Sequence, residues 1–248
     1  MRKTARKGTN GDRMDIKLSA RMQMNVDMVT EKRVADIGCD HAFVSIYLVD
    51  KKIADHVYAM DVKPGPVEIA RANVSGYGME DRITVRLSDG FSMLGEDEAD
   101  CAIIAGMGGP LMVNILKGGK KHTDNGIHLV LQPQSEINQV RLYLYEIGYE
   151  IIQENMTFDE GKYYTAMKAV PACKTVKEYS EEELIYGRCL LDNRNIILSE
   201  YLQKQITRNN ELLMGLSHIH TDRTNNRIME LNHKNEIIMR ALDYYKNI

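Results

Sequence analysis

The chain has 248 residues, of which 44% are hydrophobic, and a formal net charge of −3. This length and composition can bury one large core with an appended unit and argue against a disordered protein, while the acidic balance argues against a protein that coats nucleic acid indiscriminately. No apolar run approaches the roughly eighteen residues of a spanning helix, and none follows the basic amino terminus, so we expect a cytoplasmic protein without membrane contact.

The first residues predict a mobile tail and then a helix. Residues 1–13 are basic and lack apolar periodicity, whereas residues 14–31 carry apolar side chains at roughly helical spacing. Ser19 and Asp15 are possible caps of this leading helix.

Short apolar runs then alternate with longer amphipathic segments. The runs predict buried strands over residues 33–38, 56–62, 83–90, 100–108 and 128–134, and the intervening segments predict helices over residues 43–52, 66–78, 110–121 and 135–149. This alternation predicts a parallel sheet with helices on both faces. Residues 149–158 and 162–170 then form two strand-like runs separated only by "DEG", which suits an antiparallel hairpin. A parallel sheet that ends in such a hairpin is a Rossmann-like variant, and one class of proteins that uses it is the S-adenosylmethionine methyltransferases. We expect residues 14–172 to form one such domain.

The remaining residues, 173–248, predict a helical domain. Two series of apolar residues at heptad spacing lie on either side of residues 217–226, which predicts a helical hairpin packed as an antiparallel coiled coil. The first series is Leu191, Leu198, Leu212 and Leu216; the second is Ile228, Leu231, Ile238, Leu242 and Tyr245; polar breaks are Asn195, Gln205, Asn209 and Asn235. We expect a monomer or a weak dimer formed through this coiled coil.

The residues that close each strand carry the chemistry, because ligands of open α/β sheets bind at the carboxyl ends of the strands. The first strand ends in "DIGCDH", where Gly38 allows a sharp turn, and Asp40 and Ala42 stand where a dinucleotide-binding loop has glycines. A pyrophosphate would be placed badly against Asp36 and Asp40, whereas a ligand with a sulfonium and an ammonium would be placed well.

Later strand ends extend this pattern. Asp61 stands where an acidic side chain accepts hydrogen bonds from ribose hydroxyls, and Asp89 could bond an adenine amino group. Three glycines in "AGMGG" remove side chains from a floor on which a ligand and a flat base could lie: Gly106, Gly108 and Gly109.

These residues also carry a family resemblance. The segments "VADIGCDHAFVSIYLV", "DVKPGPVEIARANV", "RLSDG", "IIAGMGGPLM", "LQPQ" and "DEGKYY" resemble successive motifs of the bacterial tRNA (adenine-22-N1)-methyltransferases, the TrmK family, over residues 14–169. Cys39 replaces the family's usual serine, and Gln134 stands where asparagine is common. The resemblance implies S-adenosylmethionine as methyl donor and N1 of adenine 22 in tRNA as acceptor. Our candidates for binding this cofactor, at and beside the strand ends, are Asp36, Gly38, Cys39, Asp61, Val62, Asp89, Gly90, Gly106 and Met107.

Methyl transfer to a ring nitrogen needs positioning of the partners more than covalent catalysis. Our candidates for catalysis are Asp40, His41 and Gln132, and our candidates for RNA binding are Lys117, Lys120, Lys121, Lys162 and Tyr164, with spaced cations on the helical hairpin as a further RNA surface. The four cysteines lie far apart without clustered histidines, so we expect no disulfide framework and no metal site.

Two alternatives remain open from the sequence. A nicotinamide-dependent dehydrogenase would need a second turn glycine, and Asp40 occupies that place. A catalytically idle RNA-binding or scaffolding protein could use the coiled coil alone. Only a methyltransferase both binds and consumes S-adenosylmethionine, so cofactor titration separates the three hypotheses.

Overall fold

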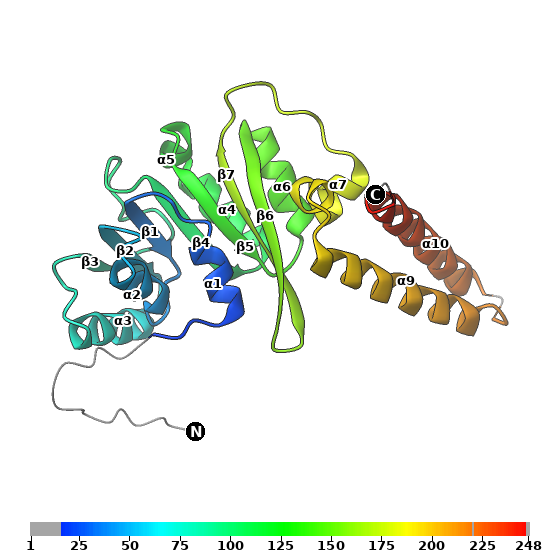
Figure 1. Cartoon of the computed structure of the whole chain (residues 1–248), viewed down its shortest axis with the longest axis horizontal. Coiled ribbons are helices and arrows are strands. Elements are labelled where there is room, and N and C mark those ends of the chain that lie inside the picture. Colours follow the sequence, from blue (N-terminus) through cyan, green and yellow to red (C-terminus); the bar gives the residue numbers. More distant parts are fainter. Residues whose placement is uncertain (1–15, 220, 247–248) are drawn as a thin grey trace.

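A computed structural model describes residues 16–219 and 221–246 and contains a sheet flanked by helices, from which a pair of long helices projects (Figure 1). The sheet has seven strands in the order β3-β2-β1-β4-β5-β7-β6. Its strands are β1 (Arg33–Ile37), β2 (His56–Asp61), β3 (Ile83–Leu87), β4 (Cys101–Met107), β5 (His128–Pro133), β6 (Tyr149–Asp159) and β7 (Lys162–Pro171). The expected tail, residues 1–13, and the possible cap Asp15 lie outside the described residues.

The sheet is mixed, as predicted. Strands β1 to β5 are parallel, whereas β7 pairs antiparallel with both β5 and β6. Because β1 lies between β2 and β4, the strand order reverses at the boundary of β1 and β4. Such a switch point opens a crevice at the carboxyl ends of the strands, which is where a ligand binds in this type of sheet.

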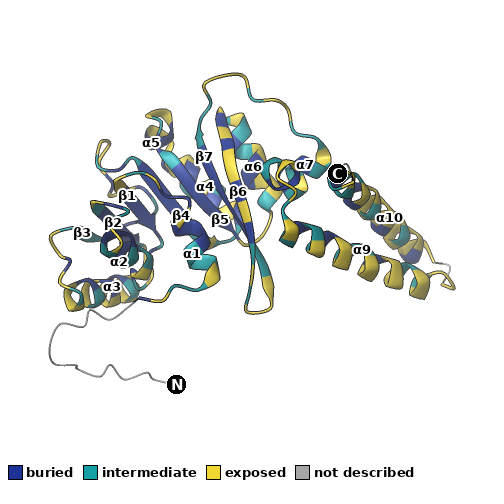
Figure 2. Ribbon diagram, in the orientation of Figure 1, coloured by how far each residue is buried: buried dark blue, intermediate teal, exposed yellow. Residues whose placement is uncertain are grey.

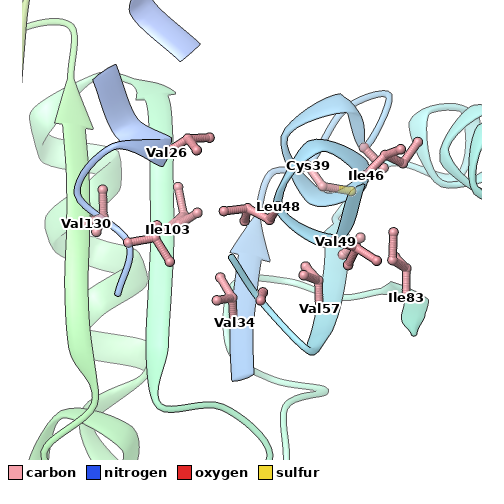
Figure 3. Packing of buried hydrophobic residues seen from close by; sticks show 14 of the residues in the cluster. Val26, Val34, Cys39, Ile46, Leu48, Val49, Val57, Ile83, Ile103 and Val130 are labelled. Carbon is pink, nitrogen blue, oxygen red and sulfur yellow. The ribbon is translucent and has the colours of Figure 1, made fainter. Parts of the chain in front are cut away.

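Helices cover both faces, because the strands are apolar on both sides. One face carries α1 (Ala20–Val26), α2 (Phe43–Asp50) and α3 (Pro64–Gly76), and the other carries α4 (Gly109–Gly118) and α6 (Ile137–Glu146). Figure 3 shows Val26 of α1 beside Ile103 of β4 and Val130 of β5. Helix α1 therefore lies over the middle of the sheet, next to the switch point.

Two predicted helices are shorter than expected. The leading helix begins at Ala20, and its predicted cap Ser19 is confirmed, since the Ser19 side chain accepts a hydrogen bond from the Met22 amide at 3.3 Å. The predicted helix over residues 110–121 is divided at Gly119 into α4 and α5 (Lys120–Asp124). A Cβ at Gly119 would lie 2.2 Å from the Phe91 ring, so the division lets the chain pass close to that side chain.

The carboxyl-terminal part begins with two short helices, α7 (Glu181–Tyr186) and α8 (Arg188–Asp192). The long helices α9 (Ile196–Leu216) and α10 (Asp222–Asp243) then run side by side, with mostly exposed outer faces (Figures 1 and 2). The predicted polar break is present, because Asn209 Nδ2 donates to Asn235 Oδ1 across the pair at 2.9 Å. The predicted helical hairpin is therefore confirmed.

Details of the predicted seam are wrong at several positions. Leu191 lies in α8 and not in α9, and Leu212 is 42% exposed. Asn195 is the N-cap of α9, where its side chain accepts from the Leu198 amide at 3.1 Å. Helix α10 begins inside the predicted connection, at Asp222, because the Thr221 side chain caps it.

A buried ion pair joins this helical part to the sheet. Arg141 of α6 and Glu154 of β6 are 2.8 Å apart with side chains 1% exposed. Arg141 also donates to the carbonyls of Leu184 and Ile185, and Glu154 accepts from the Cys189 amide. The pair therefore holds α7 and α8 against β6.

Candidate active site

A cavity of about 560 Å³ opens at the carboxyl ends of the strands, at the switch point. Loops after β1, β2, β3 and β4 contribute to its wall, and so do α1 and the end of β5. Most of the residues singled out from the sequence meet here: Asp36, Gly38, Cys39, Asp40, Asp61, Val62, Asp89, Gly90, Gly106, Met107 and Gln132.

The loop after β1 has a glycine-like backbone despite its sequence. Gly38, Asp40 and Ala42 all have left-handed φ angles, of 78°, 50° and 59°. Non-glycine residues adopt this region at a cost in free energy, and such residues gather at functional sites. At Gly38 any other residue would be strained by the left-handed φ, and its Cβ, 2.2 Å from Met107 Cε, would displace the end of the Met107 side chain, so glycine is favoured here. The loop thus keeps the shape of a nucleotide-binding turn while it places a carboxylate at the cavity.

Asp36 is the most buried acid of the cavity. It is 5% exposed, and Ser45 Oγ donates to its Oδ2 at 2.6 Å. Burial raises the pKa of Asp36 to about 6, and the nearby Asp61 charge adds to this effect. A cationic ligand would stabilise the ionised carboxylate.

Asp61 connects two loops at the end of β2. Its Oδ2 accepts from the Asp40 amide at 3.2 Å and its Oδ1 from the Lys63 amide at 2.9 Å. A carboxylate can accept about four hydrogen bonds, so both oxygens retain capacity for ligand hydroxyls. Asp61 therefore shapes the loop and faces the cavity at the same time.

The floor is formed by the turn after β4. Gly106 has φ 79°, and a Cβ there would have Gln134 Nε2 at 3.9 Å and Arg21 Nη1 at 4.0 Å as its nearest neighbours. Space therefore remains above Gly106. A Cβ at Gly109 would lie 2.6 Å from the Ser135 carbonyl, so that glycine lets the loop after β5 approach.

Two groups of predicted residues lie elsewhere. His41 does not line the cavity; its Nε2 is 3.7 Å from the Asp40 carboxylate. Lys117, Lys120 and Lys121 lie at the opposite edge of the sheet, since α4 carries the chain back from the end of β4 to the beginning of β5. The structure therefore does not bring these lysines together with the cavity.

The strand hairpin β6–β7 is connected to the cavity through helix α1. Lys162 and Tyr164 belong to the part of β7 that extends past the end of β5, because β7 pairs with β5 only from Met167 onward. The Arg21 guanidinium lies 5.2 Å above the Tyr164 ring, and the Arg21 amide donates to Asp159 at 3.2 Å. Helix α1 therefore connects the hairpin to the cavity.

Sequence reasoning missed the contribution of α1. Arg21, Met22 and Asn25 all line the cavity. Asn25 is 2% exposed, and its Oδ1 has no hydrogen-bond partner among the described residues. A polar residue within an apolar helical pattern was the available signal, since buried polar atoms are nearly always paired.

Two further properties concern metals and membranes. Within residues 16–219 and 221–246, no group of three or more His, Cys, Asp or Glu side chains could hold a metal ion. None of the helices described is both long enough and apolar enough to cross a bilayer.

The profile of the methyltransferase-domain family matches residues 18–167. The tRNA (adenine(22)-N(1))-methyltransferase of Bacillus subtilis is 27% identical over 93% of this chain and 99% of its own length. A putative tRNA methyltransferase of Mycoplasma pneumoniae is 31% identical over 65% of this chain and 74% of its own length. The structure of a putative tRNA (m1A22) methyltransferase of Streptococcus pneumoniae in complex with S-adenosyl-L-methionine has a TM-score of 0.80 and 25% identity, covering 91% of this chain and all (100%) of that chain.

The switch-point cavity, the acidic strand ends and the terminal antiparallel hairpin define a Rossmann-like methyltransferase. Within this class, the chain belongs to the TrmK-like family of tRNA (adenine-22-N1)-methyltransferases. The match extends through the helical part as well as the sheet.

Proposed function

We propose that this protein transfers a methyl group from S-adenosylmethionine to N1 of adenine 22 in tRNA. The observation that carries the proposal is the convergence of Asp36, Asp61 and Asp89 in one cavity at the switch point, in a chain of this family. Clustered carboxylates favour a ligand that carries positive charge. They disfavour the pyrophosphate of a nicotinamide cofactor, which counts against a dehydrogenase.

The residues present fit this cofactor. Asp61 faces the cavity and can accept from ribose hydroxyls, Asp89 can accept from the adenine amino group, and Asp36 provides negative charge for the cationic part. Gly38 and Gly106 leave room where side chains would intrude. When bound, S-adenosylmethionine supplies an electrophilic methyl group on its sulfonium.

Other residues are proposed to contact the acceptor base and to stabilise its charge. Adenine N1 lies on the Watson–Crick edge, so the base must leave its stack before N1 is accessible. Positive charge then develops on the adenine, and Asp40 at the cavity can stabilise it. The buried Gln132 side chain can contact a base edge. His41, which does not line the cavity, would contribute through its neighbour Asp40.

For RNA binding we favour the strand hairpin β6–β7 and helix α9. Lys162 is exposed on the hairpin, Tyr164 lies beneath Arg21, and Lys204 and Arg208 are exposed on α9. The role proposed for Lys117, Lys120 and Lys121 stays a prediction that the geometry does not favour. We also infer a cytoplasmic protein. It is a monomer or a weak dimer formed through the coiled coil, whose helices α9 and α10 pack on one another within the chain.

The test is transfer of labelled methyl to unmodified tRNA, followed by nucleoside analysis. We expect 1-methyladenosine at position 22 and no transfer to the same tRNA with G22. Cofactor binding without transfer would favour the idle RNA-binding or scaffolding protein. Binding of a nicotinamide cofactor in place of S-adenosylmethionine would favour the dehydrogenase.

A further inference from the structure

Asn25 presents a buried acceptor that the chain does not satisfy. Its side chain lines the cavity, is 2% exposed, and carries an Oδ1 without a hydrogen-bond partner among the described residues. Such an atom destabilises the ligand-free protein, so a role that compensates for it is expected. The natural complement of an amide oxygen is an N–H or O–H donor supplied by a ligand.

Arg21 lies one helical turn before Asn25 and also lines the cavity. Residues at this spacing share one face of a helix. The Arg21 guanidinium lies over the Tyr164 ring, and no carboxylate among the described residues forms an ion pair with it. A half-buried arginine in this state is available to an anion.

The position of this pair within the cavity is set by the sheet order. The acids proposed to bind the cofactor, Asp36, Asp61 and Asp89, lie at the carboxyl ends of β1, β2 and β3, on one side of the switch point. Gly106 lies near the end of β4 and Gln132 near the end of β5, on the other side. Helix α1 belongs to this second side, because Val26, the neighbour of Asn25, lies beside Ile103 and Val130 (Figure 3). Asn25 and Arg21 therefore line the half of the cavity away from the cofactor acids.

We propose that this half holds the target adenosine, with Asn25 Oδ1 accepting from the exocyclic amine and Arg21 binding the phosphate of the same nucleotide. The proposal rests on the proposed function. The amine is the only hydrogen-bond donor of an unmodified adenine base, and it is adjacent to N1. As N1 gains the methyl group, positive charge spreads to the amine, so its hydrogen bond to Asn25 strengthens in the transition state. Tyr164 holds the guanidinium in place through their cation–π contact.

The decisive experiment combines a protein change with a substrate change. Wild type and Asn25→Leu, which keeps the branched shape of the side chain but removes its polar atoms, are tested on tRNA with adenosine at position 22 and on the same tRNA with purine riboside, which lacks the amine. Loss of the amine also weakens N1 as a nucleophile, but that effect is common to both proteins and cancels in the ratio.

We expect Asn25→Leu to lower kcat on adenosine by at least about tenfold. We expect the rate ratio of the two substrates to shrink by at least about fivefold in the variant, because the contact that distinguishes them is gone. The dissociation constant of S-adenosylmethionine should stay within about twofold of wild type, which also reports an intact fold.

Arg21→Met provides an independent test. It keeps the apolar stem but removes the charge, so KM for tRNA should rise at least about tenfold with little change in kcat. Arg21→Lys should recover part of that loss. Arg71→Met, on the exposed surface of α3, is the matched control and should leave both constants unchanged.

Each contrary outcome is informative. Equal slowing of wild type and Asn25→Leu by purine riboside would show that Asn25 does not contact the amine. A cofactor dissociation constant raised tenfold, with the substrate ratio preserved, would place the cofactor ammonium at Asn25 instead. Should Asn25→Leu fail to bind cofactor because it misfolds, Asn25→Ser in the same comparison decides. An unchanged KM for Arg21→Met would overturn the phosphate contact. Failure of wild type to methylate adenosine 22 at all would reject the proposed function itself.

Discussion

Replacing Asp61 by alanine tests the cofactor half of the cavity. The side chain accepts backbone hydrogen bonds from Asp40 and Lys63 and still faces the cavity with free acceptor capacity. Its loss removes the proposed bonds to ribose hydroxyls and leaves those hydroxyls without a partner, which costs about 1–3 kcal/mol. That range corresponds to S-adenosylmethionine binding weakened by roughly 5- to 150-fold.

Isothermal calorimetry with S-adenosylmethionine measures this change directly. Asp81→Ala is the matched control, since Asp81 is exposed and precedes β3 at the opposite edge of the sheet. Asp61→Asn should lie between wild type and Asp61→Ala, because an amide keeps one acceptor oxygen. An unchanged dissociation constant for Asp61→Ala, in a protein that unfolds at the wild-type temperature, would remove Asp61 from the cofactor site.

Three further predictions concern the Asp36 carboxylate, the Arg141–Glu154 ion pair and metal independence. Burial holds the Asp36 pKa at about 6, above its ordinary 3.8, so cofactor affinity measured by calorimetry should fall as pH drops through about 6. For the same reason, the stability of the ligand-free protein should fall as pH rises from about 4 to about 6. An Asp36→Asn variant that retains both pH dependences would contradict this assignment. Arg141→Met should lower the free energy of unfolding by about 3–5 kcal/mol in denaturant titration, because it leaves Glu154 buried and unpaired. The double variant Arg141→Met with Glu154→Met should recover much of that loss. Equal losses in the single and the double variant would count against the ion pair. Methyl transfer should survive prolonged chelation, and loss of activity that zinc restores would reveal a metal site.

The sheet and its ligand edge could be predicted because their signals are local. Four of the five parallel strands are short apolar runs closed by glycine or aspartate, and parallel strands bring these ends to one edge. The sequence alone therefore predicts that Asp36, Asp61 and Asp89 share one site. The hairpin followed equally from a connection too short for a helix.

Other features depend on tertiary packing, which local patterns do not encode. The face of α1 that lines the cavity has the same spacing as a core helix, so Arg21 and Asn25 were overlooked. Leu212 follows the heptad pattern but lies in the distal half of the helical hairpin, beyond the Asn209–Asn235 contact, where two helices alone leave more surface open.

The helical hairpin offers RNA fewer cations than its sequence suggests. Arg188 pairs with Glu183 at 2.9 Å, and Arg194 donates to the Tyr244 carbonyl, so both fasten helices together. Lys204 instead bonds the Tyr163 hydroxyl of β7 at 2.8 Å, which connects α9 to the sheet hairpin. That hairpin is bound in turn by Arg21 of α1, at the cavity. The contacts thus form a continuous path from α9 across the hairpin to the cavity, so an RNA lying along α9 would meet the hairpin before it meets the site of methylation.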